Sequence, residues 1–100
     1  MIPEELARLK IERAIAISSD YDSLDEKKLK QVLLCLHNAL EILPKNGYEK
    51  EQIHSMVNML LNMDIKKFGY VFKAGSWKSS VLINKEDIIE LVWRAHSLLY

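Results

Sequence analysis

The stretch of residues 24–43 constrains the fold more than any other part of the chain. Its apolar residues recur every three or four positions, the spacing that places side chains on one face of an α-helix. They are Leu29, Val32, Leu33, Leu36, Leu40 and Leu43. Residues 44–47, Pro-Lys-Asn-Gly, favour the end of this helix. Because such a stripe is stable only when it is buried, we expect this to be the core helix.

A first helix is predicted from about Pro3 to Ser18 or Ser19. Proline suits the first helical position because its φ is fixed, and Glu4 and Glu5 follow where the helix dipole favours negative charge. The apolar residues assigned to its buried face are Leu6, Leu9, Ala14 and Ile15, with Ile11 on the flank of that face. The charged residues between them are expected to face water.

Two more helices are predicted in the second half of the chain. The third has an apolar face made of Ile53, Met56, Val57, Leu60 and Leu61. The last has one stripe made of Ile88, Leu91, Val92, Ala95 and Leu99, and a second stripe made of Ile89, Trp93, His96 and Tyr100. A helix with two apolar stripes is either central in a bundle or has a face left for a partner.

Three helix starts carry residue pairs that are typical of helix caps. The pairs are Ser23 with Glu26, Asn46 with Glu49, and Asn84 with Asp87. The first side chain of such a pair can accept a hydrogen bond from a backbone N–H group of the first turn. These pairs therefore predict where the second, third and fourth helices begin.

Residues 70–83 interrupt the helical pattern. Two β-prone runs, 70–73 and 79–83, flank a turn-like stretch, which predicts a β-hairpin or an extended segment. An isolated ribbon of this kind is marginal in water, so it would have to lie against the helices. We predict a mainly α-helical fold, a three- to four-helix bundle with this segment before the C-terminal helix. A hydrophobic share of 49% with 28% charged residues favours a single domain over residues 1–100.

Charge balance indicates which partners are unfavourable, and the lone cysteine and the short apolar runs indicate the cellular compartment. Fourteen Lys and Arg residues balance fourteen Asp and Glu residues, so no net positive charge favours nucleic acid or an anionic membrane. Cys35 lies in an apolar run, where a reduced and buried thiol is expected. Charged residues interrupt the N-terminal stretch and every apolar run, so neither a signal peptide nor a membrane span is predicted. We expect a cytoplasmic protein.

Calcium and phosphate sites are excluded by residue spacing. The acidic patch Asp20, Asp22, Asp25 and Glu26 begins with alternating carboxylates, as a calcium loop does. However, Asp25 stands where that loop needs a glycine, and Gln31 where it needs a bidentate glutamate. A phosphate-binding loop needs two glycines before its lysine and a helix after it, whereas residues 75–79 contain one glycine and precede a β-prone run.

The soft and imidazole ligands of the chain are Cys35, His37, His54 and His96. They form no Cys-x-x-Cys or His-x-x-x-His pair, so a zinc site would have to be assembled from separate helices. Cys35 stands between Leu34 and Leu36, a setting that favours packing over nucleophilic catalysis. We predict no catalytic residue, metal or cofactor, and partly buried structural roles for His37 and His96.

Lysines near aromatic residues keep a nucleic-acid-binding regulator as the alternative function. Residues 66–78 contain Lys66, Lys67, Lys73 and Lys78 together with Phe68, Tyr70, Phe72 and Trp77. Such a mixture can bind a single strand by stacking and phosphate contacts. The start of the second helix is acidic before it is basic, which argues against a phosphate-facing role for it.

Two features that a minimal core does not explain favour a non-catalytic protein-binding module. They are the second stripe of the last helix and the segment around Trp77, since aromatic residues anchor protein interfaces. The predicted partner-binding residues are Tyr70, Trp77, Lys78, Asp20, Asp22, Asp25, Trp93 and Tyr100. Within this class we favour an inhibitor or immunity-type protein that neutralises a toxin or an enzyme, by analogy of size and fold class alone.

Two other hypotheses stay open at this point. The two-striped C-terminal helix could form the seam of a homodimer. An enzyme would require a deep pocket lined by His37, His54 and Cys35, which only the fold can bring together.

Overall fold

The computed structural model describes residues 2–44, 46–62 and 85–100, which form four α-helices and one 3-10 turn. The elements are α1 (Pro3–Ser18), η1 (Tyr21–Ser23), α2 (Glu26–Ile42), α3 (Tyr48–Leu61) and α4 (Lys85–Ser97). The prediction of a mainly α-helical fold is confirmed, and the described ranges contain no strand. The predicted hairpin at 70–83 lies outside the described residues.

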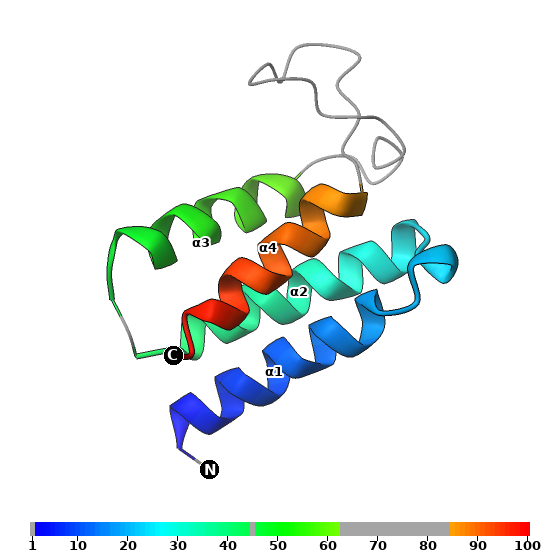
Figure 1. The fold of residues 1–100 in the computed structure, drawn as a ribbon. Helices are drawn as coiled ribbons and strands as arrows, with labels where there is room; N and C mark the ends of the chain where they lie inside the picture. The colour runs from blue at the N-terminus through cyan, green and yellow to red at the C-terminus, as the bar shows by residue number, and fades with distance from the viewer. Residues whose placement is uncertain (1, 45, 63–84) are drawn as a thin grey trace.

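Helix α2 is the centre of the bundle. It packs against each of the other three helices, and α4 also contacts both α1 and α3. In Figure 1, α4 runs across α2 with α1 and α3 to either side of it. The predicted face of α2 is confirmed in full, since all six of its apolar residues are buried. They are Leu29, Val32, Leu33, Leu36, Leu40 and Leu43.

Helices α3 and α4 contribute the rest of the core with their predicted faces. Most of these residues are buried, namely Ile53, Val57 and Leu60 on α3 and Ile88, Leu91, Val92 and Ala95 on α4. Leu61 and Leu99 are partly buried and pack against this core. Met56 departs from the prediction, because its side chain is exposed at the edge of α3. There its sulfur lies 4.0 Å from Nη1 of Arg94 on α4.

The buried face of α1 differs from the predicted one. It consists of Ala7, Ile11, Ala14 and Ser18, whereas Leu6 and Leu9 are 36% and 49% exposed and Ile15 is half-buried. Residues 7, 11, 14 and 18 keep the helical spacing of three and four, so the pattern is present but rotated from the predicted face. Small side chains along this line let α1 pack on α2, and the Ser18 hydroxyl donates to the carbonyl of Ile15. The assignment of Leu6 and Leu9 to the core was wrong.

The helix caps also differ from the predicted pairs. Asp25, not Ser23, caps α2, and its carboxylate accepts a 2.8 Å hydrogen bond from the backbone N–H of Lys28. Ser23 instead donates to the carbonyl of Asp20 and accepts from the ammonium group of Lys28, because it belongs to the 3-10 turn. Helix α3 follows Gly47, which has no side chain to cap it, so the predicted Asn46 cap was wrong. The predicted Asn84 cap lies outside the described residues.

Candidate functional site

The second stripe of α4 forms an ordered row of rings on the surface. Trp93 and His96 contact edge to face with ring centroids 5.6 Å apart, and His96 and Tyr100 do the same at 5.2 Å. We call these three residues the aromatic row. Trp93 is 53% exposed and Tyr100 76% exposed, while His96 is half-buried between them. Trp93 and Tyr100 are therefore surface residues of the bundle, whereas Ile89 of the same stripe is half-buried and packs against the core.

Helix α1 borders the aromatic row at the C-terminal end of α4. The guanidinium carbon of Arg8 lies 5.7 Å from the centroid of the Tyr100 ring, within the range of a cation–π contact. A shallow recess lies beside this contact, and it is lined by Glu4, Arg8, Leu43, Leu98, Leu99 and Tyr100. The row thus has at one end a shallow recess that both leucines and charged residues of each sign line.

Arg94 fixes α4 against α3 next to the aromatic row. Its guanidinium group donates to Glu49 at 3.0 Å and to Gln52 at 3.2 Å. Since Arg94 follows Trp93 in the helix, the contact holds the backbone from which the Trp93 ring projects. A ring presented from a fixed backbone loses little conformational freedom when it binds a partner.

The acidic turn lies at the opposite end of α4. Asp20, Asp22 and Asp25 are all exposed around η1, and the Tyr21 hydroxyl donates a 2.6 Å hydrogen bond to Glu86 in the first turn of α4. This bond holds the pKa of the Glu86 carboxyl below its ordinary value and raises the pKa of the Tyr21 hydroxyl. The ammonium group of Lys85 lies 5.0 Å from the centroid of the Tyr21 ring. These contacts attach the turn to the start of α4.

The structure separates the predicted partner-binding residues into two groups. At 1.5 Å per helical residue, Trp93 lies about 10 Å along the axis from Glu86, where the acidic turn is attached, and Tyr100 follows the end of α4 at Ser97. Asp25 has a structural role as the cap of α2. Tyr70, Trp77 and Lys78 lie outside the described residues.

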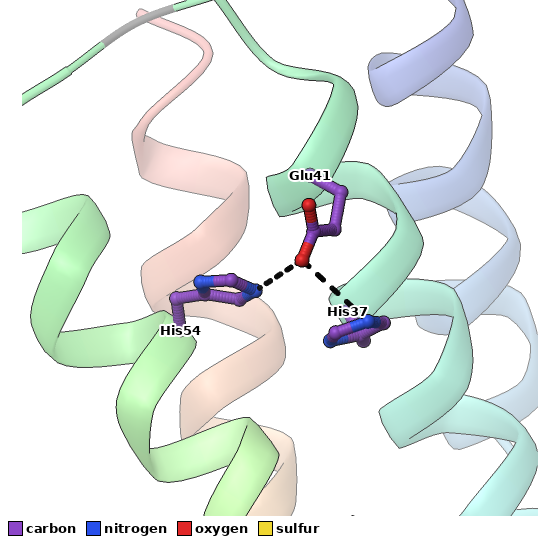
Figure 2. A group of neighbouring side chains, drawn as sticks. All are labelled: His37, Glu41 and His54. Atoms are coloured by element: carbon purple, nitrogen blue, oxygen red, sulfur yellow. Dashed lines mark ion pairs between the residues drawn. The ribbon is translucent and has the colours of Figure 1, made fainter.

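A second constellation joins α2 and α3. His37 and Glu41 stand one turn apart on α2, and His54 comes from α3 (Figure 2). One oxygen of Glu41 lies 3.7 Å from Nε2 of His37 and 3.3 Å from Nε2 of His54. The two imidazole rings are stacked, with centroids 5.3 Å apart and planes 25° apart. We call these three residues the histidine cluster.

Sequence reasoning missed the histidine cluster. His37 and Glu41 have the i, i+4 spacing that places them on one helix face, but His54 reaches them only because α3 packs beside α2. A search for a carboxylate one turn from a histidine would have found the first two. Cys35 is outside the cluster, and it is half-buried against the core, not fully buried as expected. The predicted partial burial of His37 and His96 is confirmed.

The lysines near the start of α2 bear on the alternative of a nucleic-acid-binding regulator. The ammonium group of Lys28 donates to the Ser23 hydroxyl, whereas Lys27 and Lys30 are exposed. Among the residues that the structure describes, no helix combines the length and apolar character needed to cross a membrane. Comparisons with protein-family models, curated proteins and solved structures found no match to the chain.

Proposed function

We propose that this chain is a protein-binding module that uses the aromatic row of α4 as its main contact. The observation that carries the proposal is the exposure of Trp93, which is 53% accessible although it stands in an ordered row of rings. Tryptophan and tyrosine are the residues most enriched among interface hot spots. The half-buried His96 joins the two rings and keeps the row in one arrangement.

The acidic turn near the start of α4 favours a partner that has a basic patch beside an apolar surface, whereas the row itself is bordered by both Arg8 and Glu4. Asp20 and Asp22 are exposed at one end of α4, and ring faces also accept cations. Acidic groups at the edge of an interface accelerate the encounter with a basic protein, whereas buried rings slow its dissociation. The two groups of residues therefore have different kinetic roles in the proposal.

The experiment isolates a partner from the native host with the tagged chain and then measures binding to the purified partner. Trp93→Ala should weaken binding by about 2 kcal/mol or more, mainly through faster dissociation, and leave the thermal midpoint nearly unchanged. The double variant Asp20→Asn with Asp22→Asn should mainly slow association. Raising the salt concentration should reduce the difference in association rate between this variant and the wild type.

The matched control is Leu34→Ala. Leu34 is 41% exposed on α2, so this variant also removes an exposed apolar side chain, but from another helix. It should bind as the wild type does. If Trp93→Ala and Leu34→Ala bind the purified partner equally well, the aromatic row is not the interface.

The specific form that we propose is an inhibitor or immunity-type protein. In that case the captured partner is a toxin or an enzyme, and one equivalent of the chain abolishes its activity. The Trp93→Ala variant should then require a higher concentration for the same inhibition, in proportion to its weaker binding. A partner whose activity is unchanged by a saturating amount of the chain would contradict the inhibitor form. The proposal of a protein-binding module would then be tested by the affinities of the variants alone.

A further inference from the structure

We propose that His37, Glu41 and His54 form a binding site for a divalent transition-metal ion, with zinc as the best match, which links α2 to α3. The proposal concerns a region separate from the aromatic row and does not depend on the proposed function. It starts from the chemistry of the three groups. Two imidazoles and one carboxylate are borderline and hard ligands, a set that binds zinc in proteins and leaves a fourth position for water.

The spacing of the donor atoms is close to that required by one ion. Ligands at 2.0–2.1 Å around a tetrahedral zinc ion stand roughly 3.3 Å from one another. The Glu41 oxygen lies 3.3 Å from the His54 nitrogen and 3.7 Å from the His37 nitrogen. One ligand atom from each of the three residues falls within 4.8 Å of the others. Small side-chain rotations are therefore sufficient to bring the three donors around one ion.

The hydrogen bonding of the two imidazoles leaves room for a further ligand. Nδ1 of His37 and Nε2 of His54 are buried atoms that have no hydrogen-bond partner. Buried polar atoms are normally satisfied, and an ion beside Glu41 would satisfy Nε2 of His54; the nitrogen of His37 that faces Glu41 is Nε2, not the unpartnered Nδ1. The Nε2 atom of His54 is also the one that faces Glu41, so a cation between them would bind this nitrogen and the carboxylate together.

The electrostatic surroundings favour a cation at this place. Within the described ranges, the ion-pair contacts of Glu41 are to the two histidines and not to a lysine or an arginine. A metal ion is bound by neutral imidazoles and ionised carboxylates, so as ligands the three residues contribute a single negative charge. The Glu41 side chain is 55% exposed and those of the histidines 29% and 28%, so an ion can enter from solvent without unfolding the bundle.

The stacked rings must turn when the ion binds. Their planes are 25° apart, and lone pairs in nearly parallel rings do not converge on one point. Rotation of each half-buried ring about its Cβ–Cγ bond can direct a nitrogen at the ion. A site that needs this rearrangement and has three protein ligands should bind zinc more weakly than a closed four-ligand site.

The test titrates the full-length, metal-stripped chain with zinc chloride in a calorimeter. One equivalent should bind, and His54→Gln or Glu41→Gln should weaken binding at least about tenfold, since even losing a residue that only supports a ligand costs that much. At free zinc about 100 times the dissociation constant, the thermal midpoint of the wild type should rise by roughly 10 °C. The matched control is His96→Gln, which removes the histidine of the aromatic row and should bind zinc as the wild type does.

A second measurement uses the wild-type chain alone, so it stands even if a variant fails to fold. Nitrogen NMR of the imidazole side chains should show zinc-induced shifts for His37 and His54 and none of comparable size for His96. The proposal is wrong if the shift is largest for His96, if no imidazole shifts, or if folded His54→Gln binds zinc as tightly as the wild type.

Discussion

Helices α1 and α2 run beside each other in the bundle, yet they build their contact from different side chains. The buried face of α2 consists of large aliphatic residues such as Leu33, Leu36 and Leu40. That of α1 consists mostly of small residues, Ala7, Ala14 and Ser18, with Ile11 as the one large side chain. The large apolar residues Leu6 and Leu9 of α1 stay exposed.

This difference shows when the spacing of large apolar residues identifies the buried face of a helix. In α2 the large residues that recur at helical spacing are the buried ones, while Leu34 lies off that face and is exposed, so the buried face follows from the pattern. In α1 they are not, because two helices can approach more closely where the side chains between them are small. Size therefore indicates the buried face correctly for the helix that fills the core, and incorrectly for the helix that packs close against it.

The largest expected effect comes from the large-residue side of this contact. Leu36→Ala removes a fully buried side chain from the face of α2 and should lower the free energy of unfolding by about 2–5 kcal/mol. Urea denaturation measures this value. Leu34→Ala is the matched control, because the same atoms are removed from a 41% exposed position two residues away. Equal losses in the two variants would show that the assignment of the buried face of α2 is wrong.

A smaller loss is expected when the small-residue side is enlarged. Ala14→Leu inserts a large side chain where Ala14 is fully buried in the bundle, and overpacking of this kind costs about 1–3 kcal/mol. Ala16→Leu makes the same change at an exposed position of the same helix and should be nearly neutral. Denaturation of both variants tests the close approach of α1. A neutral Ala14→Leu variant would mean that the helices have room between them.

The smallest effect is expected at the position where the sequence prediction failed. Leu9→Ala should change the free energy of unfolding by less than about 0.5 kcal/mol, because the Leu9 side chain is 49% exposed. Ile11→Ala, at a fully buried position of the same helix, should cost about 2–5 kcal/mol. Thermal or urea unfolding compares the two. If Leu9→Ala is the more damaging change, α1 presents its larger residues to the bundle after all.

The two candidate sites differ in how much of each could be predicted from the sequence. The aromatic row could be predicted as a stripe, because Trp93, His96 and Tyr100 have helical spacing in the sequence, although Tyr100 lies beyond the end of α4. Whether that stripe was core or surface depended on where α1 and α3 pack. The histidine cluster was not predicted, because His54 belongs to a different helix from His37 and Glu41.

The sequence by itself determined the approximate positions of the four helices, the buried face of α2 and the existence of a second stripe on α4. These features depend on periodicity within a few turns, which each segment carries in its own residues. The tertiary structure alone decided that α1 turns its small residues inward, that Trp93 stays exposed and that His54 meets His37 and Glu41. The physical reason is that each of these depends on the distance and rotation between two helices, which are set by the packing of their side chains together and are not encoded in either helix alone.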